Sequence, residues 1–251
     1  MMIRVLPMRT DDAFTSMALD EAILRLNATG RSPSTLRFWT WSPSAVSIGF
    51  FQSISKEVDL AAAERHGVQV VRRITGGGAV FHDSDGELTY SFVCREGDVP
   101  DDIIESYRVI CGGLVLGFRR MGISAEFRPV NDVQVNGRKI SGSAQTRRDG
   151  SILQHGTILV SPDVRLMFEV LKVGGTKISD KSIASVYERV TTVERETGKK
   201  PGMDEVMEQM VEGFGEALGA RIFHGEPTEE ELALAADLRK KYSSREWNWR
   251  R

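Results

Sequence analysis

Two dipeptides, Asn136-Gly137 and Asp149-Gly150, constrain the fold of this sequence more than any other feature. The first separates NDVQV from RKISG, and the second separates SAQTRR from SILQHGTILV. Asn-Gly and Asp-Gly favour two-residue turns in which both residues have positive φ, and such turns join neighbouring antiparallel strands. Residues 131–160 are therefore predicted to form three consecutive antiparallel strands.

The rest of the chain alternates between helical and strand periodicity. Residues 87–94 alternate strictly and predict a half-buried strand. Residues 161–172 carry an apolar stripe at helical spacing, with Ser161 as N-cap and Pro162 at the first helical position. Because no βαβ repetition is present, we expect an α+β (α/β) fold, a mixed, largely antiparallel β-sheet core packed by helices, as a single domain over residues 1–251. Further helices are predicted within 16–26, 58–67, 103–122, 202–219 and 228–242 and near 184, and further strands within 35–41, 44–51 and 68–73, the first two around a turn.

Composition excludes several classes of protein. The formal charge is -2, whereas nucleic-acid binders need a basic excess to neutralise phosphates. No apolar run approaches the length of a membrane span and the first residues lack an apolar signal segment, so a cytoplasmic protein is expected. Two cysteines, Cys94 and Cys111, with four histidines fit neither a closed zinc site nor a disulfide framework. Small molecules or a protein partner are the expected ligands.

Residues 72–83 read RRITGGGAVFHD and place two cations just before three consecutive glycines. Glycine tolerates positive φ and has no Cβ, so the N–H groups of residues 76–78 could approach an anionic or flat ligand closely. The alternative is a bulge or tight corner, but Arg72, Arg73 and Thr75 favour an anion site. The pattern matches neither a Walker phosphate loop nor a dinucleotide fingerprint, because the required Gly-Lys-Ser/Thr and G-x-G-x-x-G are absent.

A second polar group, Asn131, Asp132 and Lys139, lies on the first predicted hairpin. A lysine close to a phosphate oxygen in a partly desolvated site gains about 4 kcal/mol of Coulomb energy before desolvation, but a solvated strand lysine gains little. Small residues after Lys139 favour the functional interpretation, because a strand without bulk leaves room for a ligand. These residues are Ser141, Gly142, Ser143 and Ala144.

Three segments together resemble a known family. RRITGGGAVFHD (72–83), NDVQVNGRKISGSAQ (131–145) and LQHGTILV (153–160), in this order and spacing, are similar to the signature segments of the lipoate protein ligase family, relatives of biotin protein ligases and octanoyltransferases. The resemblance extends from SMALDEAIL near the start of the chain to KYSSREWNW near its end. It implies the biotin/lipoate protein ligase catalytic-domain fold.

By this resemblance, the enzyme joins lipoate to ATP, releases pyrophosphate and keeps lipoyl-AMP bound until a lysine of a lipoyl-acceptor protein attacks. ATP and Mg²⁺ are then required, and catalysis is positioning plus electrostatic stabilisation without a protein nucleophile. Lys139 would be the catalytic residue beside the reacting carbonyl and α-phosphate, and Asp132 would also contact the metal. The implied substrate and lipoyl-AMP contacts are Arg73, Thr75, Gly76, Gly77, Gly78, Ala79, Asn131, Asp132, Ser141, Gly142, Ser143, Ala144, His155, Gly156 and Thr157.

Two histidines and one loop have less defined roles. His82 and His155 are candidate general bases, but the sequence shows no partner that would tune them, so structural or substrate-orienting roles are favoured. Residues 174–185 form a candidate lid that would shield an acyl-adenylate from water. A surface connection is the alternative.

Two other functions stay open. A cysteine-dependent octanoyl or lipoyl transferase of the same fold needs a thiolate near Lys139 and no ATP. Cys94 and Cys111 lie on apolar stripes that predict inert core thiols. A non-catalytic homologue that binds lipoate or its carrier is the other alternative, against which the intact Arg73 and Lys139 argue.

The chain departs from the family pattern in two places. Tyr187 stands where an arginine is expected and Thr192 where an asparagine is expected, which weakens the adenylate contacts implied for that segment. Longer ligases continue into an accessory domain that this chain is expected to lack. We expect it to be the large subunit of a split ligase, with a small accessory-domain subunit contacting Trp247 and Trp249. Preference for lipoate or octanoate and the identity of the acceptor remain open.

Overall fold

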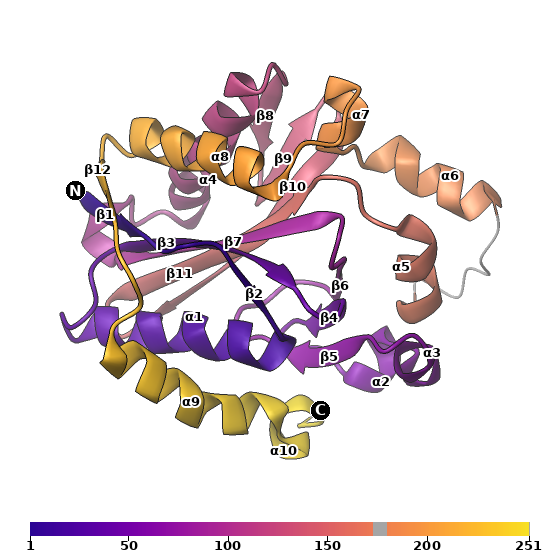
Figure 1. Ribbon diagram of the computed structural model, residues 1–251, viewed down its shortest axis with the longest axis horizontal. Helices are drawn as coiled ribbons and strands as arrows, with labels where there is room; N and C mark the ends of the chain where they lie inside the picture. The colour runs from indigo at the N-terminus through magenta and orange to yellow at the C-terminus, as the bar shows by residue number, and fades with distance from the viewer. Residues whose placement is uncertain (173–179, 251) are drawn as a thin grey trace.

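The computed structural model describes residues 1–172 and 180–250, with the backbone alone for residues 180–183. Within these ranges, a nine-stranded mixed sheet has the order β12-β1-β3-β7-β11-β10-β9-β8 with β2 beside β3, and a smaller sheet has the order β5-β4-β6 (Figure 1). Strand β1 pairs in parallel with β3 and β12, whereas the run from β3 to β8 is antiparallel, which confirms the predicted fold class. The strands are β1 (Met2–Val5), β2 (Arg9–Asp11), β3 (Thr35–Trp41), β4 (Ala45–Ile48), β5 (Gln69–Arg72), β6 (Val80–His82), β7 (Glu87–Arg95), β8 (Ala125–Arg128), β9 (Asp132–Val135), β10 (Arg138–Arg148), β11 (Ser151–Leu159) and β12 (Arg221–His224).

Both predicted hairpins are confirmed. Asn136 and Gly137, between β9 and β10, have φ of 50° and 76°, and Asp149 and Gly150, between β10 and β11, have φ of 54° and 80°. All four values lie in the left-handed region that type I′ turns require. The second turn sets the register that opposes Ala144 to His155, and this register positions much of the site.

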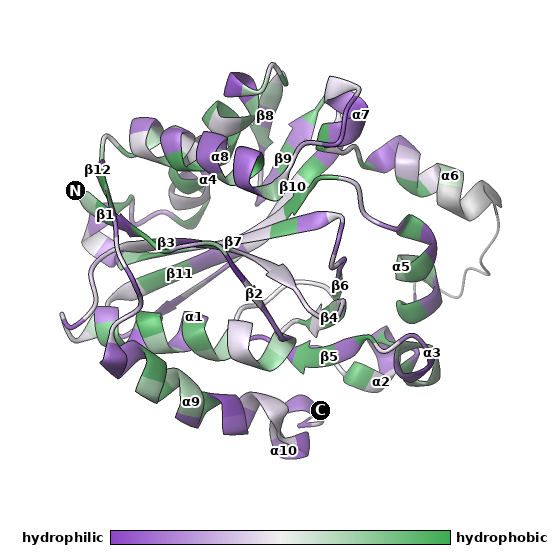
Figure 2. Ribbon diagram, viewed as in Figure 1, coloured by the Kyte–Doolittle hydropathy of each residue, from purple (hydrophilic) through white to green (hydrophobic). Residues whose placement is uncertain are grey.

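Helices cover both faces of the large sheet. In Figure 1, α4 (Ile103–Arg120) and α8 (Met203–Ala217) lie on one side, and α1 (Ala13–Ala28) and α9 (Glu229–Ser243) on the other. Hydrophobic and hydrophilic residues alternate along these helices (Figure 2), as expected when one helical face packs on a core. No helix in the described ranges is long and apolar enough to cross a membrane. The shorter helices are α2 (Ile54–Glu57), α3 (Leu60–Arg65), η1 (Glu96–Asp98), α5 (Val164–Val170), α6 (Asp180–Arg189), α7 (Val193–Thr197) and α10 (Arg245–Asn248).

Two local predictions were wrong for reasons of tertiary packing. Strand β7 is buried on both faces rather than half-buried, because helices cover both sides of the sheet. Strands β3 and β4 follow one another across a turn, as predicted, and belong to different sheets. Helix α5 begins at Val164 with Asp163 as its N-cap, since the Asp163 carboxylate accepts from two N–H groups of the first turn. Ser161 and Pro162 instead pack against Gly86.

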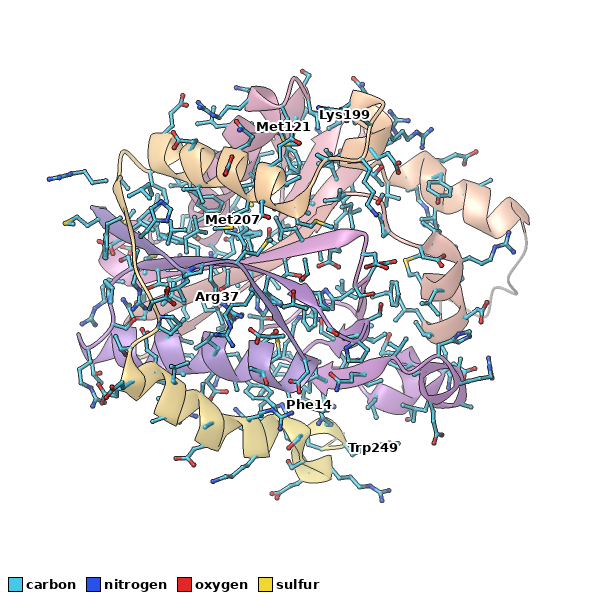
Figure 3. The ribbon with its side chains drawn as sticks, in the orientation of Figure 1. Phe14, Arg37, Met121, Lys199, Met207 and Trp249 are labelled. Carbon is cyan, nitrogen blue, oxygen red and sulfur yellow. The ribbon has the colours of Figure 1, made fainter. Side chains whose placement is uncertain are left out.

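The small sheet presents the glycine loop, residues 73–79, between β5 and β6. Arg72 connects the β5 edge of the small sheet to helix α10. Its guanidinium donates to the carbonyl oxygens of Gly49, Gln52 and Asn248, among others. Trp247 in α10 packs on the same edge, with its indole N–H donating to Arg72 O at 2.8 Å. Figure 3 shows the neighbouring Trp249 at the outer edge of the molecule, where it is 42% exposed.

Candidate functional site

A cavity of about 360 Å³ lies where the glycine loop meets strands β10, β11 and β7. This volume is at the lower end of the range, roughly 300–1,000 Å³, typical of small-molecule sites. Much of its wall is apolar, and polar groups converge from the glycine loop and β10. The lining residues are Met17, Trp41, Ser47, Arg73, Gly77, Gly78, Ala79, Val80, Phe81, His82, Thr89, Asn131, Lys139, Gly142, Ser143, Ala144, His155, Gly156, Thr157, Leu159, Met167, Leu171 and Val190.

The glycine loop passes so close to strand β4 that two positions need glycine. A Cβ on Gly49 would stand 2.0 Å from the carbonyl oxygen of Gly77, a distance that no real contact has. Gly77 itself has a φ of 94°, which side chains rarely tolerate. The loop is therefore defined by backbone contacts with β4, and it exposes Gly77 and Gly78 to the cavity.

Lys139 and Asp132 form an ion pair at 2.7 Å on the β9–β10 hairpin. The ammonium group lies against Gly142, where an added Cβ would stand 2.4 Å from Nζ. Asn131 holds the same strand, donating from Nδ2 to Ser143 O at 2.5 Å. Small residues on β10 thus leave the space that the lysine occupies, as the sequence indicated.

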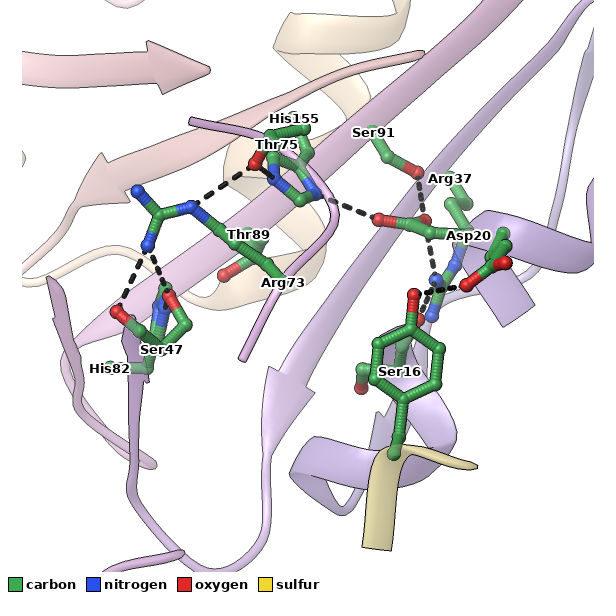
Figure 4. A network of polar contacts seen from close by, with 12 residues as sticks. Ser16, Asp20, Arg37, Ser47, Arg73, Thr75, His82, Thr89, Ser91 and His155 are labelled. Atoms are coloured by element: carbon green, nitrogen blue, oxygen red, sulfur yellow. Dashed lines mark hydrogen bonds and ion pairs between the residues drawn. The ribbon is translucent and has the colours of Figure 1, made fainter. Parts of the chain in front are cut away.

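A buried chain of polar contacts forms one wall of the cavity (Figure 4). His155 Nδ1 lies 2.9 Å from Asp20 Oδ2, and its Nε2 lies 2.7 Å from Thr75 Oγ1. Asp20 also accepts from Arg37 Nη1 at 2.8 Å and from Ser91 Oγ at 2.7 Å. Burial opposes ionisation of Asp20, but Arg37 and His155 outweigh it and hold the pKa of this carboxyl below 3.8. Arg37 lies between α1 and the large sheet (Figure 3).

His82 has an equivalent carboxylate partner. Its Nδ1 lies 3.0 Å from both carboxylate oxygens of Glu87, and its Nε2 lies 2.8 Å from Ser47 Oγ. The ring stacks on Trp41 with 4.1 Å between centroids. Both histidines therefore have carboxylate partners that the sequence analysis did not identify. Asp20 and His155 are 135 positions apart, whereas Glu87 is only five positions from His82 and could have been considered.

Most of the predicted site residues line the cavity, but four do not. Thr75 lies behind the wall on His155, and the carbonyl of Gly76 accepts from Arg73 at 2.8 Å. Asp132 pairs with Lys139 outside the cavity lining, and Ser141 is fully buried. The apolar lining from Met17, Phe81, Leu159, Met167, Leu171 and Val190 was not predicted, because core and pocket side chains share the same periodicity.

The candidate lid and the two departures from the family pattern lie beside one another in sequence. Residues 174–179 of the lid are outside the described residues, and helix α6 confirms the predicted helical structure near Ala184. Tyr187 is 38% exposed on α6. Thr192 caps helix α7, with its hydroxyl accepting from Arg195 N at 3.1 Å.

Both cysteines are buried core thiols, as predicted. Cys111 Sγ lies 3.7 Å from Ser143 Oγ, behind the cavity wall. Burial raises the pKa of Cys111 to about 11 and that of Cys94 to about 12. Neither side chain lines the cavity, so neither is arranged as a thiolate nucleophile.

Comparison with known proteins assigns the chain to a family. The family model of the lipoyl protein ligase A/B catalytic domain matches residues 12–215. The chain belongs to this family. Octanoyltransferases LipM of Kyrpidia tusciae and Brevibacillus brevis are 40% and 37% identical to it, over 99% and 94% of this chain and 98% and 94% of theirs.

Solved structures of this family share the fold. A bi-partite lipoate protein ligase from Thermoplasma acidophilum, solved with its lipoyl domain, superposes with a TM-score of 0.89 at 36% identity, covering 99% of this chain and 96% of the other. A lipoate-protein ligase A bound with ATP gives 0.86 at 34% identity, covering 99% of each chain. The protein is thus an enzyme of the lipoate ligase and octanoyltransferase family.

The curated relatives contradict one expectation from the sequence. The chain was expected to be an ATP-dependent ligase acting through lipoyl-AMP, as the large subunit of a split enzyme. Relatives that are 33–40% identical over nearly the whole chain are named octanoyltransferases. The expectation was wrong because the signature segments describe the shared acyl site, and they do not identify the acyl donor.

Proposed function

We propose that this protein is an octanoyltransferase, which moves a medium-chain acyl group from a carrier thioester to the ε-amine of a lysine on a lipoyl-acceptor protein. The observation that carries the proposal is the apolar cavity with Lys139 at one end. The names of the curated relatives support the same reaction class.

The length of the cavity suits an eight-carbon chain. Gly142, beside the lysine, opposes Thr157, which opposes Thr89 on the next strand. Two strand spacings correspond to about 10 Å. Trp41, at the far end, donates to Thr89 Oγ1 at 2.7 Å. An extended chain advances roughly 1.2 Å per bond, so the seven bonds of an octanoyl chain span about 8 Å.

The charge at the other end suits acyl transfer. When the acceptor amine attacks the thioester carbonyl, the carbonyl oxygen becomes an oxyanion, and the Lys139 ammonium can stabilise it. Collapse of the tetrahedral intermediate forms the C–N bond and breaks the C–S bond. The amine loses one proton overall, and the departing sulfur takes one up to leave as a thiol. The ion pair with Asp132 holds the Lys139 ammonium group against Gly142.

We place no cysteine in this reaction. A covalent route needs a thiolate at the carbonyl, but Cys111 is separated from the cavity by Ser143 and its pKa is raised to about 11. Direct transfer between the two substrates is consistent with this arrangement.

Mass spectrometry of a purified lipoyl-acceptor domain tests the proposal. The domain is incubated with the protein and octanoyl carrier protein, and in parallel with octanoate or lipoate plus ATP and Mg²⁺. We expect an octanoyl mass shift from the thioester without ATP, retained when Cys94 and Cys111 are both changed to alanine. A mass shift only in the presence of ATP would overturn the proposal that a carrier thioester is the acyl donor. Loss of the shift in the cysteine variant would overturn direct transfer between the two substrates.

A further inference from the structure

Arg73 is a buried cation that uses all of its N–H groups on the protein itself. A guanidinium has five such donors. Nε donates to Thr75 Oγ1 at 3.1 Å, and Nη1 donates to the carbonyl and hydroxyl oxygens of Ser47 at 2.9 and 3.1 Å. Nη2 donates to the carbonyl oxygens of Gly76 and Gly78 at 2.8 and 2.7 Å. These contacts account for all five donors, so Arg73 holds the glycine loop rather than an anion.

The Asp20 carboxylate determines where the ring proton of His155 lies. A carboxylate oxygen only accepts, so His155 Nδ1 carries the ring proton and donates it to Asp20 Oδ2 at 2.9 Å. Nε2 of the neutral ring is then an acceptor for the Thr75 hydroxyl at 2.7 Å, and Thr75 Oγ1 in turn accepts from Arg73 Nε.

The other side of Arg73 repeats the same pattern. The Glu87 carboxylate only accepts, so His82 carries its ring proton on Nδ1 and donates it to Glu87. Nε2 of the neutral ring then accepts from the Ser47 hydroxyl at 2.8 Å, and Ser47 Oγ accepts from Arg73 Nη1. Two hydroxyl–histidine–carboxylate chains thus meet on one guanidinium. Figure 4 shows the chain that runs from Arg73 through Thr75 and His155 to Asp20.

We infer that Arg73 is a positioning residue that sets the glycine loop, and that His82 and His155, both as neutral Nδ1–H tautomers, orient it through Ser47 and Thr75. Each carboxylate orients its histidine ring, and each ring orients a hydroxyl group. The two hydroxyl groups align the guanidinium, which donates to the carbonyl oxygens of the glycine loop. Neither histidine transfers a proton to or from the substrate.

The electrostatics of this wall agree with a neutral His155. Burial lowers the pKa of His155 below its ordinary value, and the charge of Arg73 acts in the same direction. Asp20, itself paired with Arg37, opposes them. A protonated ring would add a second buried cation beside the guanidinium.

Nitrogen-15 NMR of the substrate-free protein tests the tautomers directly. Long-range proton–nitrogen correlations distinguish Nδ1–H from Nε2–H and from the charged ring, and His66→Gln and His224→Gln variants assign the two exposed histidines. We expect His82 and His155 to be neutral Nδ1–H tautomers at about pH 7. An Nε2–H tautomer or a charged ring at either position would overturn the inference. No substrate is needed, so this failure is distinguishable from failure of the proposed transfer reaction.

The Asp20→Asn variant tests the direction of the chain. Asp20 Oδ1 faces Arg37 and Ser91, so the new amide group can face His155 Nδ1 and donate to it. We expect the His155 proton to move to Nε2 and KM for the acyl donor to rise on the order of tenfold, with a smaller change in kcat. An unchanged tautomer with an unchanged KM would refute the role of Asp20.

A matched pair at Thr75 separates alignment from mere packing. Thr75→Ser keeps the hydroxyl and should keep the Nδ1–H signal of His155 and the wild-type KM. Thr75→Val keeps the shape but leaves the Nε–H of Arg73 without its acceptor, so KM should rise on the order of tenfold. Equal KM values in two folded variants would refute the role of the hydroxyl.

Discussion

Gly49→Ala should displace the glycine loop without removing any polar group of the site. The new Cβ would stand 2.0 Å from Gly77 O, and ordinary contacts begin at 3.4 Å, so the carbonyl would have to retreat by about 1.4 Å. Misplacement of about 1 Å can cost on the order of 100-fold in rate. We expect a loss of that order in kcat/KM, measured by mass spectrometry of the acceptor domain.

Overpacking alone also destabilises, by typically about 1–3 kcal/mol, so the variant needs a matched control. Gly213→Ala would place a Cβ 2.2 Å from Gly113 O where α4 and α8 pack, on the face opposite α1. Both variants should lower Tm, which falls roughly 2–4 °C per kcal/mol for a chain of this size. Gly49→Ala alone should lose kcat/KM at a temperature where both are folded. Equal losses, or wild-type kinetics in Gly49→Ala, would refute the reasoning.

Three further outcomes are expected. Lys139→Gln should lower kcat on the order of 100-fold, which steady-state kinetics measures. The free energy of unfolding, measured with urea, should change by about 1 kcal/mol or less, because the ion pair of Lys139 with Asp132 is substantially exposed. Iodoacetamide at about pH 8 should leave Cys94 and Cys111 unmodified in the folded protein, since burial raises their pKa to about 12 and about 11, which mass spectrometry checks. The free energy of unfolding should fall below pH 6.5, because burial lowers the pKa of His155 in the folded protein. At such pH the unfolded chain binds a proton that the folded chain does not. In urea titrations, His155→Gln should make this fall with pH less steep.

Each of these outcomes has a contrary result. A wild-type kcat in the Lys139 variant would remove the oxyanion role. Alkylation of either thiol before unfolding would reopen a covalent route. An identical pH dependence in the His155 variant would show that another group controls acid stability.

Local chemistry determined the elements that the sequence predicted well. The positive-φ turns at Asn136-Gly137 and Asp149-Gly150 specify antiparallel partners within a few residues, so β9, β10 and β11 followed directly. The same hairpin brings Asp132 and Lys139 together on paired strands. The Lys139 end of the site could therefore be predicted because its residues are close together in the sequence.

Packing between distant segments determined the rest. Glycines and arginines at residues 72–78 indicated an anion site, but whether Arg73 faces a ligand depends on where Ser47 and the loop carbonyls lie. The same holds for burial of β7 on both faces, which depends on helices from both ends of the chain. Periodicity describes one element at a time and cannot report such contacts.

By itself, the sequence determined the fold class, the hairpins and the family resemblance, because turn preferences, periodicity and short motifs act over a few residues. Only the tertiary structure decided that Cys111 lies behind the cavity wall and that His155 has a carboxylate partner. Asp20 reaches His155 across 135 positions, and contacts at such separation are set by how sheets and helices pack, which no local pattern encodes.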